Sequence, residues 1–273
     1  MPQSACLPFD VKNNAMKKHS RKRIFAASVL SRREVLGFIG GTAAVSLVGC
    51  LRRQSVAVVP PTSTQTQTST VATPLCVVRP EQTEGPYFVD EKLNRSDIRS
   101  DPSDGSVKQG VPLRLVFQVS QVNDRACTPL NNAIVDVWHC DAEGIYSDVS
   151  DRSFDTVGKK FLRGYQVTDA NGTAEFVTIY PGWYPGRTVH IHFKIRTDSG
   201  AQQSYEFTSQ LYFDDALTDR VHAQTPYATR GQRTQKNNQD GIFRDGGEQL
   251  MLQITKAAEG YVGRFDIGLE SVG

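Results

Sequence analysis

Apolar and polar side chains alternate in short segments from residue 112 onward. In PLRLVFQVSQV (112–122), apolar side chains occupy every second position from Leu113 to Val119. Successive side chains of a strand point to opposite faces, so this alternation predicts a strand with one face in a core. Other runs rich in β-branched and aromatic residues predict strands over 133–140, 172–180, 189–197 and 204–213.

Turn-forming residues separate these predicted strands. They include Thr128-Pro129, Asn171-Gly172, Pro181-Gly182 and Ser199-Gly200. Apart from a short candidate helix around 247–258, no long stretch has the period of a helix, and no internal repeat is visible. The pattern therefore predicts an all-β fold, an antiparallel β-sandwich with irregular loops, as one domain over 76–273.

Charge is distributed unevenly along the 273 residues. Residues 1–49 carry eight Lys and Arg against two Asp and Glu, a net charge of +6. The whole chain carries +2, so the remainder carries −4. A mildly acidic body lacks the basic face of a nucleic-acid-binding protein, and we expect no nucleic-acid partner.

The basic excess belongs to an N-terminal leader. Adjacent Arg32 and Arg33 precede an apolar, glycine-rich run from Val35 to Val48, which is too short to span a membrane comfortably. Paired arginines before such a run resemble a twin-arginine export signal, which is read by a receptor and is not itself an anchor. An ordinary cleaved signal or a buried helix is the alternative, and Met16 is an alternative start.

The apolar run ends in LVGC, which resembles a lipoprotein processing box with Cys50 as the lipidated residue. We therefore interpret residues 1–50 as a signal segment. Residues 51–75, rich in Thr, Ser, Gln and Pro, are expected to form a flexible linker. We expect an exported protein, periplasmic or on the cell surface, anchored to a bacterial membrane through the lipid on Cys50.

Three cysteines follow the linker: Cys76, Cys127 and Cys140. Outside the cytoplasm, an odd number predicts one disulfide and one remaining thiol, although the sequence does not choose the pair. Three buried free cysteines are the alternative.

The stretch YPGWYPGRTVHIHF places His190 and His192 two residues apart on a predicted strand. The two side chains then point to the same face, about 6.6 Å apart along the strand, so they can bind one metal ion. A hydrogen-bonded or surface pair is the alternative. Ile191, Phe193 and Ile195 would point the other way, into the core.

Two tyrosines become candidates because turns stand next to them. Tyr184 can approach His190 only if the chain reverses, and Pro185-Gly186 between them supplies such a turn. Tyr146 follows a Glu143-Gly144 turn that would lift it out of the sheet. Taken alone, Tyr146 is better interpreted as a packed or rim tyrosine.

Together these motifs resemble a known family. DVWHCDAEGIYSD, GYQVTDANGTAEFVTIYPGWYPGRTVHIHF and SQLYFDD are similar to segments of the intradiol ring-cleavage dioxygenases, the family of catechol and protocatechuate dioxygenases. The resemblance runs from about Cys76 to about Asp215. Its most specific part is the order Tyr, turn, Arg, His-x-His, since a lone His-x-His would not identify the family.

The resemblance implies one ferric ion, Fe(III), held by Tyr146, Tyr184, His190 and His192. The donor types agree, because phenolate oxygen is a hard anionic ligand that suits Fe(III), and a bound cation displaces the phenol proton. The implied reaction is cleavage of a catechol-type aromatic by O2 between its two hydroxyl-bearing carbons, giving a muconate-type diacid, in aromatic compound catabolism. Tyr184 would be displaced by the catechol and take up one of its protons.

Three further residues receive roles from the resemblance. Arg187 would lie over the substrate ring and stabilise negative charge there, with a surface salt bridge as the alternative. Gln210 would contact Arg187, unless it is an ordinary polar strand residue. Tyr87 would line the substrate pocket.

Other aromatic and histidine side chains stay outside the predicted site. Trp138, Trp183 and Phe193 are expected in the core. His139 is expected to face away from the metal, and His222 has no surrounding motif. Residues 216–273 lie outside the strongest match and are expected to form an edge, a cap or a contact in an oligomer.

One departure from the family pattern and two rival folds remain. Only Pro185 and Gly186 separate Tyr184 from Arg187, a shorter stretch than in intracellular members, which predicts a more open site for bulkier or varied catechols.

A cupin also uses His-x-His, but it needs a Glu a few residues later, which HIHFKIRTDSG lacks. A non-catalytic transthyretin-like or carbohydrate-binding β-sandwich would leave Tyr146 and Arg187 unexplained.

Overall fold

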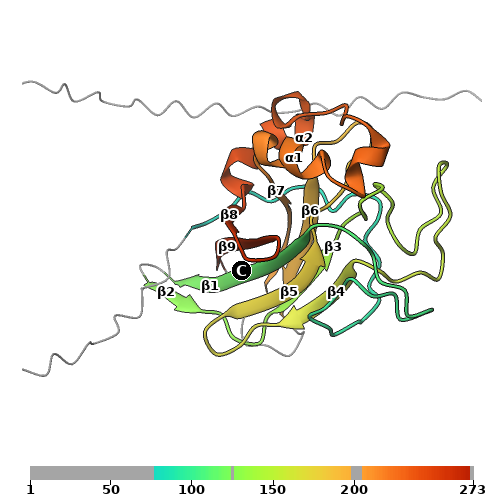
Figure 1. Cartoon of the computed structure of the whole chain (residues 1–273). Coiled ribbons are helices and arrows are strands. Elements are labelled where there is room, and N and C mark those ends of the chain that lie inside the picture. The colour runs from blue at the N-terminus through green and yellow to red at the C-terminus, as the bar shows by residue number, and fades with distance from the viewer. Residues whose placement is uncertain (1–76, 124–125, 198–204, 271–273) are drawn as a thin grey trace, which may run out of the picture. The chain divides into compact units, whose positions relative to one another are not determined.

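Two β-sheets packed face to face form the body of the protein (Figure 1). The computed structural model describes residues 77–123, 126–197 and 205–270. Strands predominate over short helices in this part of the chain, so the expected all-β sandwich is confirmed. The predicted signal segment 1–50, with Cys50, and the predicted linker 51–75 lie outside the described residues.

The first sheet has the strand order β2-β1-β9-β8, with β5 also paired to β1. Its strands are β1 (Pro112–Asn123), β2 (Ala126–Pro129), β5 (Thr173–Ile179), β8 (Gln253–Lys256) and β9 (Tyr261–Glu270). One pair departs from the antiparallel expectation, because β9 runs parallel to β1. Most residues of the domain lie between these two strands in the sequence. A local pattern of residues cannot predict pairing between strands so far apart.

The second sheet is antiparallel throughout and carries the candidate site. Its strands β3 (Ile134–Trp138), β4 (Arg163–Val167), β6 (His190–Arg196) and β7 (Glu206–Tyr212) follow the order β4-β3-β6-β7. Strand β6 is an inner strand, hydrogen-bonded to β3 on one side and to β7 on the other. Pairing on both sides fixes its register, and therefore the face on which each of its side chains stands.

Phenylalanines from three strands join the two sheets. The ring centroid of Phe193 on β6 lies 5.4 Å from that of Phe117 on β1 and 5.4 Å from that of Phe265 on β9. All three are buried in one core with Ile191 and Ile195, which confirms that this face of β6 points inward. Truncating one of these rings to alanine would cost about 3–5 kcal/mol.

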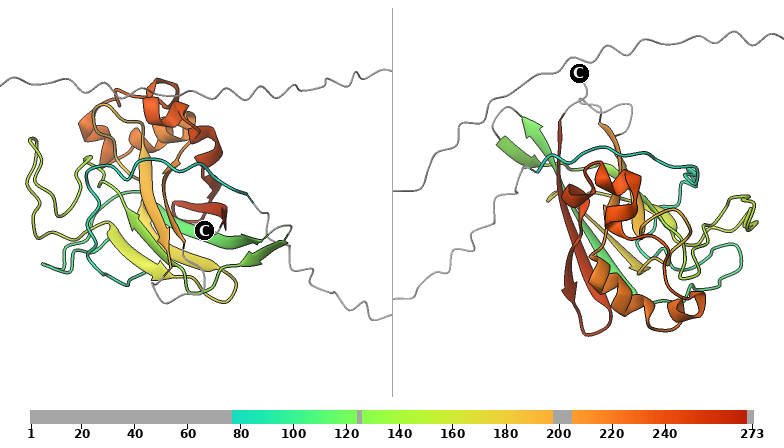
Figure 2. Two further views of the ribbon diagram at one scale, coloured as in Figure 1. Left: turned by 180° about the vertical axis from the view of Figure 1, so that it is seen from behind. Right: turned by 90° about the horizontal axis from the view of Figure 1, so that it is seen from above.

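Short helices gather at one end of the sandwich, near the ends of β6 and β7 (Figures 1 and 2). They are α1 (Asp215–His222), η1 (Tyr227–Arg230), η2 (Asn237–Gln239), α2 (Gly241–Arg244) and η3 (Gly247–Leu250). Within the described residues, none is long and apolar enough to cross a membrane. The C-terminal segment thus supplies a cap of helices, the edge strand β8 and the inner strand β9.

The helix predicted around 247–258 is wrong. Only the turn η3 is helical, and β8 begins three residues after it ends. Residues 253–256 pair with β9 in an antiparallel ladder. This pairing within the sheet overrides the weak local helical pattern.

The described cysteines agree with the expectation of one disulfide and one remaining thiol. Cys127 is disulfide-bonded, and Cys140 is free and buried. Burial raises the pKa of the Cys140 thiol, so it stays protonated at neutral pH. Cys76 lies outside the described residues.

Candidate active site

The two histidines of β6 point to the same side of the sheet, as predicted. The Nε2 atoms of His190 and His192 lie 3.0 Å apart, and their ring centroids lie 4.7 Å apart. Both side chains are buried. Two ring nitrogens therefore face each other across a space that one metal ion could share.

A hydrogen bond on the far side of the His190 ring sets its tautomer. Nδ1 lies 2.6 Å from the Thr188 carbonyl oxygen, which can only accept, so Nδ1 carries the proton and Nε2 presents a lone pair. Burial lowers the pKa of His190 and of His192 well below the usual value, so both rings are neutral at physiological pH. Neutral imidazole is the form that binds a metal.

The turn at Pro185-Gly186 brings Tyr184 back to the histidines. Gly186 has a φ of 89°, a left-handed conformation that glycine adopts without strain. The Tyr184 hydroxyl lies 3.1 Å from His190 Nε2. The predicted reversal is present, and it places a phenol oxygen beside two imidazole nitrogens.

Tyr146 reaches the same place from the loop that follows β3. The Asp141 carboxylate accepts two backbone N–H groups of this loop, at 2.9 and 3.0 Å, and holds it in a tight turn. Gly144 lies in this turn at a φ of 79°, so close to Trp183 that an added Cβ would stand 2.2 Å from its carbonyl oxygen. Only glycine fits there, as the predicted Glu143-Gly144 turn requires.

The Tyr146 ring faces the other candidate ligands. Its centroid lies 5.8 Å from that of Tyr184 and 6.2 Å from that of His192. Its hydroxyl oxygen is buried and makes no hydrogen bond within the described part of the chain. Burial, together with the neighbouring Tyr184 phenol, raises the pKa of Tyr146 well above its usual value. An unpartnered buried polar atom costs about 1–3 kcal/mol, and a bound cation would remove that cost.

Three groups converge on the single Nε2 lone pair of His190. They are His192 Nε2 at 3.0 Å, Tyr184 Oη at 3.1 Å and Arg187 Nη1 at 3.4 Å. One lone pair cannot satisfy all three, whereas a cation could be shared by the two imidazole nitrogens and the phenol oxygen. The described residues contain no group of three or more His, Cys, Asp and Glu side chains that could hold a metal. A metal here would therefore depend on the phenol oxygens.

Arg187 belongs to the site rather than to a surface salt bridge. Its Nε donates to the Asp240 carboxylate at 2.9 Å, and its Nη2 donates to the side-chain oxygen of Gln210. Gln210 stands opposite His192 on β7, and its Nε2 donates to the Thr83 carbonyl at 2.9 Å. The expected contact between Gln210 and Arg187 is present.

A cavity of about 450 Å³ opens against the two tyrosines, a volume typical of small-molecule sites. Aromatic side chains line it together with polar and charged ones; the lining includes Tyr87, Tyr146, Phe154, Tyr184, Pro185, Glu143, Asp151, Ser153 and Arg230.

Tyr87 lies in this wall, where the resemblance placed it. Its ring centroid lies 4.6 Å from that of Tyr146, and its hydroxyl donates to the Asp151 carboxylate at 2.9 Å. Burial and this carboxylate raise the pKa of Tyr87 to about 12. Tyr87 therefore stays a neutral hydrogen-bond donor and a flat wall for an aromatic ligand.

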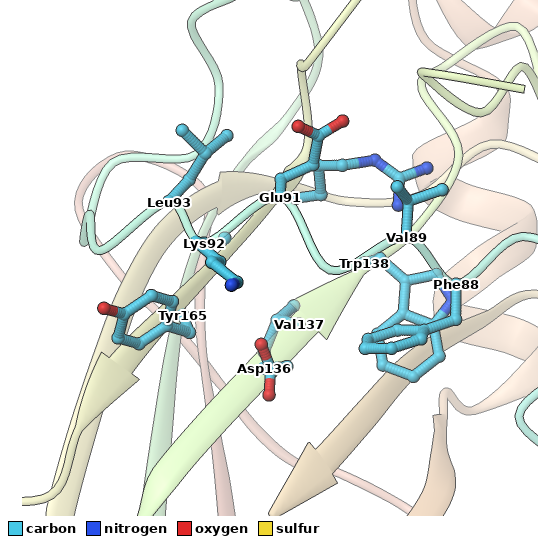
Figure 3. A pocket seen from close by; sticks show the side chains of 11 residues that line it. Phe88, Val89, Glu91, Lys92, Leu93, Asp136, Val137, Trp138 and Tyr165 are labelled. Atoms are coloured by element: carbon cyan, nitrogen blue, oxygen red, sulfur yellow. The ribbon is translucent and has the colours of Figure 1, made fainter.

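A second recess, beside Phe88 and Trp138, is too small for a substrate (Figure 3). Its volume is about 10 Å³, room for about one water molecule at most. Figure 3 shows Phe88 beside the Trp138 indole, and their ring centroids lie 4.8 Å apart. Of these two, only the larger cavity has room for a small molecule, and it is the candidate substrate site.

Several residues of the site had no motif in the sequence. Trp138, expected in the core, is buried but packs its indole on the His192 ring. Gly85, at a φ of 73°, lies so close to His192 that an added Cβ would stand 3.1 Å from Cε1. The local sequence around Asp240 indicates only a residue that caps a helix, and Asp240 does cap α2. Its pairing with Arg187 has no signal in the local sequence.

The other unassigned side chains lie as expected. His139 is bonded at both ring nitrogens, to the Cys140 carbonyl at 2.8 Å and to the Thr178 hydroxyl at 2.7 Å, away from the tyrosines. His222 stacks on Tyr227, with centroids 5.1 Å apart. Trp183 is largely buried, as expected, and Arg230 of the cavity lining packs over its ring.

Comparison with known proteins agrees with this geometry. Residues 83–237, more than half of the chain, match the family model described as Dioxygenase. The solved intradiol ring-cleavage dioxygenase from Tetranychus urticae is 32% identical with a TM-score of 0.62, over 71% of this chain and 95% of that one. The chain therefore belongs to the intradiol ring-cleavage dioxygenases.

Two curated relatives match over shorter regions. The protocatechuate 3,4-dioxygenase beta chain of Burkholderia cepacia is 32% identical over 157 residues, 53% of this chain and 65% of that protein. Catechol 1,2-dioxygenase 1 of Acinetobacter lwoffii is 27% identical over 165 residues, 50% of this chain and 49% of that protein. The chain thus spans less than two-thirds of the length of these relatives.

Proposed function

We propose that this protein cleaves a catechol-type aromatic ring with O2, between the two hydroxyl-bearing carbons, to a muconate-type diacid. One observation carries the proposal. His192 Nε2 and Tyr184 Oη lie 3.0 and 3.1 Å from His190 Nε2, with the unpartnered Tyr146 hydroxyl nearby, at the wall of a cavity of about 450 Å³. Membership of the ring-cleaving family indicates the class of reaction.

The same residues suit a single ferric ion as the resident metal. Tyr146 and Tyr184 would hold it through phenolate oxygens, and His190 and His192 through Nε2. Hard anionic oxygen donors favour Fe(III) over softer metals, and neutral imidazoles complete the set. When bound, the ferric ion would draw electron density from a catechol and make its ring reactive toward O2.

The burial of Tyr184 supports its proposed role as the group that accepts a proton when the substrate binds. Both tyrosines line the cavity, but Tyr184 is half-buried whereas Tyr146 is fully buried. Burial raises the pKa of the Tyr184 phenol, so its oxygen binds a proton firmly once it is free of a cation. We assign Tyr184 as the base for a catechol hydroxyl.

Arg187 supplies the positive charge of the site. Its Nη1 lies 3.4 Å from His190 Nε2, next to one of the candidate ligands. A fixed guanidinium at this place stabilises negative charge that develops on a bound ring. Gln210 holds the guanidinium through Nη2.

We also propose that the site accepts substituted catechols. The turn between Tyr184 and Arg187 is short, and no described atom lies within 4 Å of the point where a Gly186 Cβ would stand. A panel of catechols with different ring substituents tests this. We expect kcat/KM values for substituted catechols close to that for catechol, and a narrow preference for catechol would contradict the proposal.

Iron analysis and product identification test the reaction itself. We expect the purified protein to contain iron, to be red-brown from tyrosinate-to-iron charge transfer, and to consume O2 while forming a muconate-type diacid from catechol. A colourless protein that binds no iron and cleaves no catechol would refute the proposal and favour a non-catalytic β-sandwich.

Two substitutions separate the roles of the ligands. His192→Ala should lose iron and activity together, while His222→Gln, a buried histidine outside the site, should keep both. Tyr184→Phe should keep part of the iron and lose turnover. Full activity in Tyr184→Phe would remove Tyr184 as the base.

We propose that the enzyme is exported and lipid-anchored through Cys50. The motifs around Arg32-Arg33 and Cys50 support this. Fractionation of cells that express the full chain tests it, with wild type expected in the membrane fraction and Cys50→Ser expected in the soluble exported fraction. Wild type in the soluble fraction would contradict the anchor.

A further inference from the structure

Asp240 lies at the junction of η2 and α2, beyond residues 83–237 of the family match. It is 1% exposed, which is unusual for a carboxylate unless it is paired. Its two oxygens have separate partners. Oδ1 accepts the backbone N–H groups of Ile242 at 2.8 Å and Phe243 at 3.3 Å, and so caps α2.

The second oxygen of Asp240 holds the segment that leads into β6. Oδ2 accepts Arg187 Nε at 2.9 Å and the Thr188 backbone N–H at 2.8 Å. Asn237, the first residue of η2, makes a third contact with the same segment. Its Oδ1 accepts a hydrogen bond from the Thr188 hydroxyl at 2.6 Å. The η2–α2 junction is therefore attached to residues 187–188 at three points.

These contacts restrict the orientation of the Arg187 guanidinium. Asp240 engages Nε, and Gln210 engages Nη2. The remaining nitrogen, Nη1, is the one directed at His190 Nε2, 3.4 Å away. Charge-assisted hydrogen bonds on Nε and Nη2 hold the flexible Arg187 side chain in one orientation. In that orientation, Nη1 faces His190.

We propose that Asp240 is a positioning residue of the active site, which acts by aiming Arg187 at the bound substrate. The inference rests on the proposed ring cleavage. It makes Asp240, which lies beyond the family match, part of the machinery that sets the rate. Asp240 touches neither the candidate ligands nor the cavity, so it acts through the residues it holds. These are Arg187 and Thr188, and because the Thr188 carbonyl also contacts His190, the iron content separates an effect through Arg187 from one through His190.

The Asp240 carboxylate is charged in this setting. Burial acts to raise its pKa, but the Thr188 N–H and the Arg187 guanidinium outweigh burial and leave the pKa below the ordinary value. Asparagine at this position would keep an oxygen that can cap α2, but it would lose the negative charge. Its NH₂ group would face the Arg187 and Thr188 N–H donors, which it cannot accept from. Asp240→Asn is therefore the most conservative change that releases Arg187.

The test is a double-mutant cycle on the full-length, iron-loaded enzyme with catechol as substrate. We expect Asp240→Asn to lower kcat by about tenfold to a hundredfold, with a smaller change in KM, the scale of misplacing a catalytic group. Iron content and the visible absorption band should match wild type, because no ligand is touched. In an Arg187→Gln background, Asp240→Asn should have no further effect on kcat.

Asp214→Asn is the matched control. Asp214 caps α1, where its carboxylate accepts the Leu217 N–H at 2.7 Å, and it makes no contact with Arg187. This variant should keep the wild-type kcat within about twofold, within the usual error of additivity. Asp240→Glu, which keeps the charge, should recover part of the rate lost in Asp240→Asn and serves if the amide variant folds poorly.

The outcomes separate the two proposals. If wild type cleaves no catechol, the proposed function fails and the inference fails with it. If wild type is active, the inference alone is overturned by a normal kcat in Asp240→Asn, by loss of its iron, or by an equal loss of kcat in the Arg187→Gln background.

Discussion

The indole of Trp138 lies parallel to the imidazole of His192, with ring centroids 5.1 Å apart and ring planes within 8°. The two residues stand directly opposite each other on the paired strands β3 and β6. Both are buried, and Phe88 packs against the same indole. The orientation of His192 is therefore determined by packing on a neighbouring strand.

Replacing Trp138 with Leu is expected to weaken iron binding. The His192 ring would lose the flat surface that orients its Nε2, and loss of such support around a metal ligand typically costs about tenfold to a hundredfold in metal affinity. Competition with an iron chelator measures the change. Trp138→Phe keeps a flat ring and should show a smaller effect; equal affinities in all three proteins would contradict the role of the stack.

Gly85→Ala is expected to disturb the same histidine. The new Cβ would stand 3.1 Å from His192 Cε1, at a φ of 73°. Gly105→Ala is the control, because Gly105 has a φ of 75° and no described atom lies within 4 Å of the point where its Cβ would stand. Both changes should reduce the free energy of unfolding by about 1–2 kcal/mol through backbone strain. Only Gly85→Ala should also reduce iron content, and an equal reduction in both would contradict this account.

Two of the three charged side chains that line the cavity, Arg230 and Glu143, should discriminate among substrates. Arg230 lies over the Trp183 ring at 5.1 Å and forms no ion pair among the described residues. Arg230→Gln should raise the KM for a catechol carboxylate about fivefold, equivalent to about 1 kcal/mol, while the KM for catechol stays nearly constant. Glu143→Gln in the same lining should change the carboxylate KM in the opposite direction. Steady-state kinetics at low salt would show both effects, and a uniform change for every substrate would contradict a charge effect.

His139 should make the fold sensitive to acid. Burial lowers the pKa of His139 to about 4, against about 6.5 in the unfolded chain. Below pH 6.5 the unfolded chain therefore binds a proton that the folded protein does not, so stability falls as the pH drops. The loss should reach about 2 kcal/mol at pH 5. Urea unfolding at pH 7 and pH 5 should show a smaller difference for His139→Asn than for wild type, and equal differences would contradict the assignment.

Much of the site could be predicted because its signals are local. Alternation along 189–197 indicates that His190 and His192 share a face, and Pro185-Gly186 supplies a turn that can bring Tyr184 back toward them. Both follow from strand geometry and from the backbone preferences of proline and glycine. The structure contains both features.

The parts that could not be predicted depend on contacts between distant segments. The parallel pairing of β1 with β9 brings together strands from the two ends of the domain, and the candidate helix at 247–258 gives way to a strand because β9 offers it a partner. The Arg187–Asp240 ion pair spans 53 residues and has no spacing rule.

The sequence by itself determined which side chains of each strand face the core and where the chain turns, because both depend only on neighbouring residues. Its resemblance to the ring-cleaving family implied which two tyrosines and two histidines are the candidate ligands. Only the tertiary structure decided that these four side chains meet, that Trp138 and Gly85 confine His192, and that Asp240 aims Arg187. These relationships depend on how the sheets and the C-terminal helices pack, and packing is a property of the whole folded chain.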